Sequence, residues 1–227
     1  MVSIKERLHQ TQQLIQDTAN QCDRNPHDIQ LIGVTKGQPV SALIEAYDAG
    51  LTEFAENYWQ EAQYKIAQLS HLPITWHFIG PLQSNKTPAI ANHVAWVHSI
   101  SREKIARLLA SHRTPSLPPL NVCIQVNLDG EESKSGLAPE QVYNLVQQIH
   151  SLPNLKLKGL MTIPKLHANA GEQYTSFAKL RRLREELNHD LDEKLETLSM
   201  GMSNDFVAAI RAGSTMVRIG QAIFGER

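Results

Sequence analysis

The sequence of 227 residues has only two cysteines, Cys22 and Cys123, and they lie in unrelated contexts. No CxxC pair accompanies them, and the ten histidines are scattered without the spacing of a metal site. We therefore expect neither a structural metal nor a disulfide framework. Two free thiols are typical of a reducing compartment, which predicts a cytoplasmic protein.

Long hydrophobic runs and an excess of charge are also missing. No stretch approaches the roughly 18 apolar residues that a membrane span needs, and the N-terminal MVSIKERLHQ lacks an apolar signal core. The formal net charge is -1, so nothing indicates electrostatic attraction to nucleic acid or to an anionic membrane. No GxGxxG follows an apolar run, which argues against a dinucleotide-binding fold. We expect no nucleic-acid partner and no membrane partner.

What the chain does contain is a regular alternation of short apolar runs with amphipathic stretches, which is typical of parallel βαβ units. Eight candidate strands favour an α/β fold in which one (β/α)₈ TIM barrel spans residues 1–227 as a single domain. A doubly wound open sheet is the alternative. The candidate strands are residues 30–35, 52–55, 74–79, 94–98, 120–127, 155–161, 196–200 and 215–219.

Amphipathic stretches between these runs predict the helices. Only GQAIFGER follows the last strand, so we expect an extra N-terminal helix, residues 4–22, to occupy the place of the eighth barrel helix. Ser101 and Ser203 stand where helix N-caps belong, and Gly50 and Gly213 stand where helices end. The other predicted helices are residues 41–50, 57–70, 85–93, 101–112, 139–150, 172–190 and 203–213.

Two cationic residues fall on strand faces that we expect to point into the barrel. Lys36 shares a face with Ile32 and Val34, because strand side chains alternate, and Arg218 shares one with Met216. Both cations would stand near the carboxyl ends of their strands, where barrel enzymes place reactive groups. Lys36 is either a nucleophile toward carbonyl groups or a strand-end lysine that extends into solvent.

The segment SMGMSND, residues 199–205, joins the seventh strand to a helix. Its small residues and backbone N–H groups are suited to binding a phosphate, which barrels often hold after strands seven and eight. Gly220 would let the backbone approach the same group closely. A carbonyl-reactive lysine beside a phosphate site suggests a phosphorylated aldehyde, such as pyridoxal 5′-phosphate (PLP) or a sugar phosphate.

Six blocks of the sequence resemble one known family, the pyridoxal phosphate homeostasis proteins of the YggS/PROSC type. In order, they are GVTKGQP, FAENYWQE, WHFIGPLQSNK, VNLDGEESKSGL, GLMTIP and LSMGMSNDFVAAIRAGSTMVRIGQAIFGER. They run from about residue 30 to the C-terminus, and the last is some thirty residues long. Small departures, such as Ala55 where a glycine is usual, touch no expected cofactor contact.

The resemblance implies a PLP barrel of fold type III, similar to the N-terminal domain of alanine racemase. Lys36 matches the lysine that forms the covalent aldimine with PLP, and Arg218 matches the arginine that faces the pyridine nitrogen. The other matched positions are Asn57 as a cofactor contact, Ser203 and Gly220 around the phosphate with Ser199 close by, and His77 and Met161 at strand ends lining the pocket.

The resemblance also implies a role in intracellular PLP (vitamin B6) homeostasis without ordinary catalytic activity. An arginine at the ring nitrogen weakens the electron sink that most PLP enzymes need. Alanine racemases also take a second base, a tyrosine, from another domain, and we expect no such domain here. The five tyrosines fall on predicted helices or their ends, where packing is the usual role.

Alternatives remain open at this stage. They are a racemase-like PLP enzyme of low activity, a Schiff-base aldolase that acts on a sugar phosphate, and an interaction module that uses the mixed-charge stretch of residues 179–196. Lys86 and Lys134 compete with Lys36 as the labelled lysine. Expected partners are PLP, with amino acids or PLP-dependent client proteins, and the expected state is a monomer or weak dimer.

Overall fold

The structure is a computed structural model that describes residues 2–130, 135–165, 169–191 and 194–226. Within these residues, eight parallel strands pair in chain order, and the last strand pairs with the first to close a barrel. The predicted α/β barrel is confirmed, and the open-sheet alternative is wrong. The strands are β1 (Gln30–Val34), β2 (Glu53–Glu56), β3 (Thr75–Phe78), β4 (Trp96–Ile100), β5 (Leu120–Gln125), β6 (Leu155–Met161), β7 (Thr197–Ser199) and β8 (Met216–Ile219).

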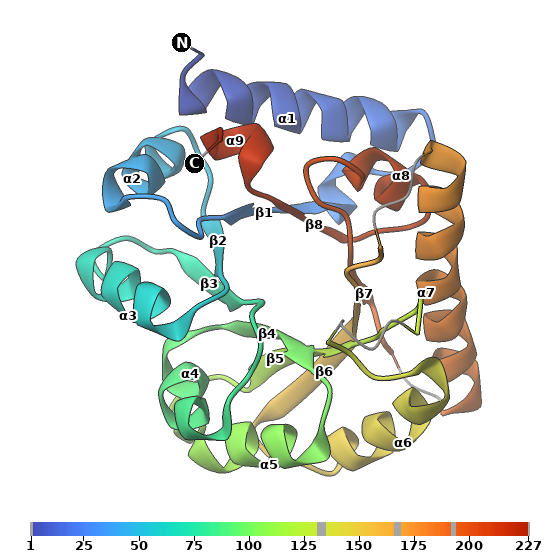
Figure 1. The fold of residues 1–227 in the computed structure, drawn as a ribbon. Helices are drawn as coiled ribbons and strands as arrows, with labels where there is room; N and C mark the ends of the chain where they lie inside the picture. The colour runs from blue at the N-terminus through green and yellow to red at the C-terminus, as the bar shows by residue number, and fades with distance from the viewer. Residues whose placement is uncertain (1, 131–134, 166–168, 192–193, 227) are drawn as a thin grey trace.

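Helices form a ring outside the barrel, as the view along its axis shows (Figure 1). They are α1 (Ile4–Asn20), α2 (Val40–Asp48), α3 (Trp59–Gln68), α4 (Thr87–His93), α5 (Glu103–His112), α6 (Pro139–His150), α7 (Ala170–Asp190), α8 (Phe206–Arg211) and α9 (Gln221–Phe224), with short 3₁₀ turns η1 (Pro26–Asp28) and η2 (Ser84–Lys86).

Helix α1 occupies the place of the eighth barrel helix, as the sequence predicted. Among the residues that the structure describes after β8, the single turn of α9 is the one helix, and α1 contacts α2, α8 and α9 (Figure 1). A capping box at its N-terminus joins Ser3 and Glu6, which satisfies backbone N–H groups that the helix itself cannot pair. Leu8 and Ala19 are fully buried, so α1 seals the ring.

Strand bounds agree with the prediction to within two residues, and β6 agrees at both ends. The prediction that Ser101 and Ser203 are helix N-caps was wrong. The chain stays extended through Arg102, which becomes the N-cap of α5 in place of Ser101. Ser203 lies in a turn before α8, whose N-cap is Asp205. Gly50 and Gly213 do follow helix ends, with φ of 99° and 104° in the left-handed region that glycine favours.

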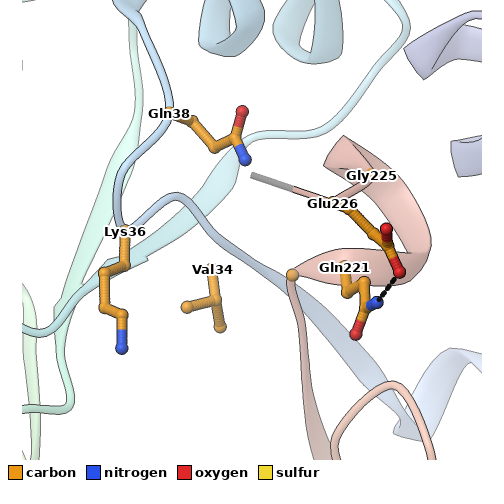
Figure 2. Close-up of a pocket in the computed structure, with 7 residues that line it drawn as sticks. Val34, Lys36, Gln38, Gln221, Gly225 and Glu226 are labelled. Carbon is orange, nitrogen blue, oxygen red and sulfur yellow. Dashed lines mark hydrogen bonds between the residues drawn. The ribbon is translucent and has the colours of Figure 1, made fainter.

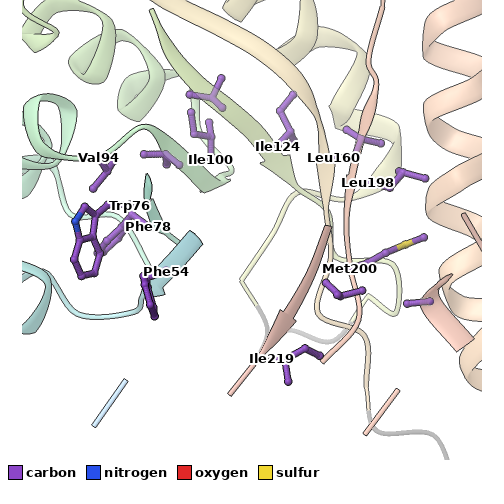
Figure 3. Close-up of a cluster of buried hydrophobic side chains, with 14 of the residues drawn as sticks. Phe54, Trp76, Phe78, Val94, Ile100, Ile124, Leu160, Leu198, Met200 and Ile219 are labelled. Carbon is purple, nitrogen blue, oxygen red and sulfur yellow. The ribbon is translucent and has the colours of Figure 1, made fainter. Parts of the chain in front are cut away.

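Alternate residues of each strand face opposite sides of the sheet. Large apolar side chains fill the layer between strands and helices, among them Phe54, Phe78 and Ile124 (Figure 3). A smaller cluster inside the barrel joins Ile32, Ala55, Ile79 and Met216, against which Val34 and Trp96 pack. The inward direction of Ile32, Val34 and Met216 confirms the alternation expected for β1 and β8.

Candidate functional site

The lysine singled out by the sequence stands in a turn that follows β1. Lys36 is half-buried, and Gly37 after it has φ of 73°. The backbone N–H of Gln38 donates to the carbonyl of Thr35 at 2.9 Å, which closes the turn. The Nζ atom of Lys36 lies 5.7 Å from the centroid of the Tyr58 ring. The amine is therefore accessible and has an aromatic neighbour.

A buried ion cluster on the helix side of the sheet fixes this turn. The Lys65 ammonium donates to the carbonyl of Thr35 and to Glu56 Oε1, both at 2.6 Å, and to Glu61 Oε1 at 2.7 Å. The same Glu61 oxygen accepts the N–H of Gly37 at 2.6 Å. Burial raises the pKa of Glu56, while hydrogen bonds from Lys65 and Thr35 oppose that rise. The residues on both sides of Lys36 are thus held from β2 and α3.

Five of the eight predicted site residues line one cavity of about 280 Å³ at the barrel mouth. It receives side chains or backbone from the ends of β1, β2 and β8 and from the loop before α8. Apolar walls come from Val34 and Ile79, among others. The predicted residues brought together there are Lys36, Asn57, Ser203, Arg218 and Gly220.

A second hollow of about 440 Å³ shares the wall formed by Val34, Lys36, Gly220 and Gln221 (Figure 2). The Lys36 side chain extends into the open space beside Val34 in this view. The side-chain amide of Gln221 donates to Glu226 Oε1 at 3.4 Å, and both residues line this hollow. The amine therefore borders two adjoining spaces rather than a closed chamber.

Asn57 follows β2 and carries an amide oxygen without a hydrogen-bond partner among the described residues, although that atom is buried. Gly80 packs closely against the backbone of Asn57, and a Cβ at Gly80 would lie 1.8 Å from the Asn57 backbone carbonyl oxygen. A buried polar atom without a partner costs free energy in proteins. The amide oxygen is thus available to a donor group of a ligand.

Arg218 lies on β8 and is only 2% exposed. Its guanidinium donates to Ser199 Oγ at 2.8 Å and to the carbonyl of Thr162 at 3.0 Å. Burial lowers the pKa of Arg218 to about 10, while the nearby Asp205 carboxylate opposes that shift. The guanidinium therefore stays charged at neutral pH and keeps further N–H donors for the cavity.

The loop before α8 contains the predicted phosphate site. Ser203 Oγ accepts the N–H of Ala222 at 3.2 Å, which ties this loop to the start of α9. Asp205 Oδ1 accepts the N–H of Met202 at 2.6 Å. Gly201 has φ of 99°, and its carbonyl accepts the N–H of Arg218 at 2.9 Å. The loop joins Ser203 and Gly220 in one wall, and the phosphate contact itself stays a prediction.

Three predicted site residues are absent from the lining of this cavity. Met161 is fully buried at the end of β6, in register with Ser199. His77 is buried inside the barrel between Glu53 and His98. Ser199 is fully buried, with its hydroxyl between Arg218 and His98. All three side chains are buried, and their contact with the cofactor stays a prediction.

The sequence interpretation missed Glu53, His98 and Tyr58. A histidine within the apolar run of β4 was a signal for His98, since burial of an imidazole requires partners. Burial lowers the pKa of His98 well below its usual value. Tyr58 directly follows Asn57 at a strand end, which was a signal for the barrel mouth. Of the competing lysines, Lys86 lines a neighbouring hollow, and Lys134 lies outside the described residues.

The fold and the site together place the chain in one class of barrel protein, that of the alanine racemase N-terminal domain. The family model for the alanine racemase N-terminal domain matches residues 11–227. Alanine racemase from Corynebacterium glutamicum shares the fold at a TM-score of 0.70 and 15% identity, over 96% of this chain and 60% of that chain. At this identity the likeness shows the barrel architecture alone.

Relatives of higher identity narrow the class. The pyridoxal phosphate homeostasis protein of Pseudomonas aeruginosa is 51% identical over 227 residues, covering 100% of this chain and 97% of that protein. PipY of Synechococcus elongatus, solved with PLP bound, is 35% identical at a TM-score of 0.83, over 93% of this chain and 100% of that chain. The chain belongs to the pyridoxal phosphate homeostasis protein family.

Proposed function

We propose that this chain binds PLP covalently and reversibly through the amine of Lys36 and acts in intracellular PLP homeostasis. The observation that carries the proposal is the single cavity that joins Lys36, Asn57, Ser203, Arg218 and Gly220. The name of the Pseudomonas relative and the PLP bound to PipY support it. We further propose that residues 1–227 act as one PLP-binding unit.

The residues present fit PLP. Asn57 offers a buried amide oxygen that has no partner among the described residues, and Arg218 offers a cationic donor in the same cavity. Lys36 supplies the primary amine, and Ser203 with Gly220 forms the wall proposed for the phosphate. When bound, PLP supplies an aldehyde that condenses reversibly with a primary amine. The chain's contribution is to hold that amine in a fixed turn and to orient the ring.

Arg218 argues for holding the cofactor rather than for ordinary catalysis. A guanidinium can donate hydrogen bonds but cannot accept a proton, so it disfavours protonation of a ring nitrogen that faces it. The ring then stabilises a carbanion poorly. A carrier has no need of that stabilisation. Covering a reactive aldehyde and releasing it to another amine requires only Lys36 and an open mouth.

The direct test is an absorbance spectrum of the purified protein before and after borohydride reduction. We expect an imine band near roughly 420 nm that reduction removes, and peptide mapping should then place the label on Lys36. Lys36→Ala should lose the band, whereas Lys86→Ala should keep it. A band that survives in Lys36→Ala would overturn the proposal. A Schiff-base aldolase would carry no bound chromophore, so the band also excludes that alternative.

One observation favours the second candidate, a racemase-like PLP enzyme of low activity. Tyr58 lies beside Lys36, although it is 55% exposed. A tyrosine near the amine is a potential second proton carrier. Proton exchange at Cα of added amino acids, followed by NMR in deuterium oxide, tests this candidate. Rapid exchange that both Lys36→Ala and Tyr58→Phe abolish would favour the enzyme, and no exchange would favour the carrier.

Client proteins, or free amino acids, are the proposed recipients of PLP. The open wall shared by the two hollows leaves room for an incoming amine near Lys36. If the loaded protein restores activity to an apo PLP enzyme no faster than free PLP does, direct delivery is wrong.

No helix within the described residues is long and apolar enough to span a bilayer. Location in the cytoplasm and the monomer or weak dimer remain predictions.

A further inference from the structure

A continuous chain of hydrogen bonds crosses the barrel interior beneath the cavity. His77 Nε2 lies 2.6 Å from Glu53 Oε2, and His77 Nδ1 lies 2.9 Å from His98 Nε2. His98 Nδ1 lies 2.7 Å from Ser199 Oγ, which accepts from Arg218 at 2.8 Å. Residues of five different strands are therefore joined, and the chain ends at the guanidinium that lines the cofactor cavity.

These groups are shielded from water. His98 and Ser199 are fully buried and His77 is 1% exposed, while the indole of Trp96 stacks on His77 at 5.7 Å. Glu53 keeps 19% exposure of its side chain, and Arg218 borders the cavity, so the hydrogen-bonded side chains are shielded between these two ends. In such surroundings each polar atom needs a partner of the right kind, because an unsatisfied one is costly.

The chemistry of the two ends sets the direction of every bond between them. An ionised Glu53 can only accept, so His77 carries its hydrogen on Nε2, and a neutral His77 then accepts at Nδ1. His98 must accordingly donate from Nε2 and accept at Nδ1. The hydrogen that His98 accepts is that of the Ser199 hydroxyl, whose lone pairs turn toward Arg218. Burial lowers the pKa of both histidines, which agrees with two neutral rings.

We propose that His98, whose tautomer is set by its bond to His77, is a positioning residue that accepts the Ser199 hydroxyl hydrogen and so fixes the Arg218 guanidinium against the cofactor ring. The part that concerns PLP rests on the proposed function. Ser199 Oγ and the Thr162 carbonyl are the two acceptors that the structure gives for the Arg218 guanidinium among the described residues. Two acceptors fix the plane of a guanidinium, whereas one leaves it free to turn about the remaining bond.

The first experiment tests the direction of the bonds without PLP. The ring nitrogens of His77 and His98 are assigned by NMR in the apo protein labelled with ¹⁵N-histidine. We expect a hydrogen on Nε2 and none on Nδ1 for both rings at neutral pH. A hydrogen on Nδ1 of His98, or a doubly protonated ring at either position, would overturn the proposal.

The second experiment uses two variants of one residue. His98→Asn places an amide oxygen where Nδ1 was, so Ser199 keeps its acceptor while the link to His77 is lost. His98→Gln places an amide nitrogen where Nε2 was, so His77 keeps its donor while Ser199 loses its acceptor. Each variant breaks one buried link, so a purely structural role predicts equal effects of the two on PLP binding.

We expect His98→Gln to raise the dissociation constant for PLP about tenfold and to shift the absorbance band, because Arg218 loses a fixed partner. His98→Asn should stay within about twofold of the parent protein, since its Ser199 acceptor remains. Equal effects of the two variants, or none from either, would overturn the proposal. If His98→Gln fails to fold, Ser199→Ala replaces it, and we expect the same rise in the dissociation constant for PLP. A parent-like dissociation constant in Ser199→Ala would also overturn the proposal.

The two proposals fail in different ways. If the parent protein takes up no PLP, the proposed function and the cofactor part of this inference are wrong, while the histidine tautomers still decide the direction of the bonds. If the parent binds PLP but the tautomers or the matched variants disagree, only the positioning role of His98 is wrong.

Discussion

At the residue scale, the amide oxygen of Asn57 separates ligand binding from stability. It has no partner among the described residues, so removing it takes away no hydrogen bond that the folded chain makes. We expect Asn57→Ala to change the free energy of unfolding by less than about 0.5 kcal/mol. The dissociation constant for PLP should rise about tenfold, because the contact that we propose between this amide and the cofactor is removed. Urea unfolding and absorbance titration measure the two quantities.

Asn92 provides the matched control for this prediction. Its amide donates to the carbonyls of Pro88 and His112 and accepts from Thr114, all away from the cavity. Asn92→Ala should lower the free energy of unfolding by about 1–2 kcal/mol and leave PLP binding unchanged. If instead Asn57→Ala destabilises the chain as much as Asn92→Ala does, the orphaned amide is part of the scaffold and not of the site.

Single residues also show how far the sequence predicts a site. Lys36 and Arg218 could be placed because strand alternation and the carboxyl end of a barrel are local rules that a sequence displays. The partnership of Glu53, His77 and His98 could not, because it depends on the register of neighbouring strands and on distances across the interior. Neither quantity is visible before the barrel is closed.

At the element scale, the turn after β1 depends on a helix that lies outside the sheet. Lys65 of α3 is 2% exposed and pairs with the buried Glu56. Lys65→Met should lower the free energy of unfolding by about 3–5 kcal/mol, because it leaves a buried carboxylate unpaired. Urea denaturation measures the loss, and the PLP titration reports whether Lys36 is misplaced as the turn loosens.

Two variants test the cause of that loss. Lys65→Met combined with Glu56→Gln should recover part of the stability, because no unpaired charge stays buried. The exposed pair of Arg107 and Glu103 is the surface comparison, and Arg107→Ala should cost less than about 1 kcal/mol. A double variant less stable than Lys65→Met alone would contradict the explanation by buried charge.

The helix ends also show which element boundaries the sequence pattern predicts and which it does not. Helix ends at Gly50 and Gly213 were predictable, since a positive φ strongly favours glycine. The start of α8 was not, because Ser203 gives its oxygen to the N–H of Ala222, far along the chain. A serine before an apolar run predicts a cap only when no tertiary partner competes for its hydroxyl.

At the scale of the whole molecule, the ring of helices depends on the first one. Leu8 is fully buried on α1, whereas Leu14 on the same helix is 45% exposed. Leu8→Ala should lower the free energy of unfolding by about 2–5 kcal/mol, and Leu14→Ala by less than about 0.5 kcal/mol. Urea unfolding of both variants checks the difference. Equal losses would mean that α1 does not seal the barrel as described.

The buried histidines couple global stability to pH. Burial lowers the pKa of His77 and His98 from the ordinary value of 6.5. Below pH 6.5 the unfolded chain therefore binds protons that the folded chain does not, and the free energy of unfolding falls as pH falls. Each histidine contributes a slope of up to about 1.4 kcal/mol per pH unit until the pH reaches its folded pKa.

Urea unfolding at about pH 6 and pH 5 measures this slope. His98→Gln should make it shallower by up to about 1.4 kcal/mol per pH unit. A parent-like slope in His98→Gln would show that the buried ring is not the group that the unfolded chain protonates.

The pairing of β8 with β1 has a consequence for contacts with other polypeptides. None of the eight described strands is left with an open flank of unpaired backbone groups. These strands therefore cannot bind an extended peptide by strand addition, and two copies of the chain cannot associate by pairing their strand edges. Recognition falls instead to side chains on loops and helices, and the sheet offers no template for aggregation.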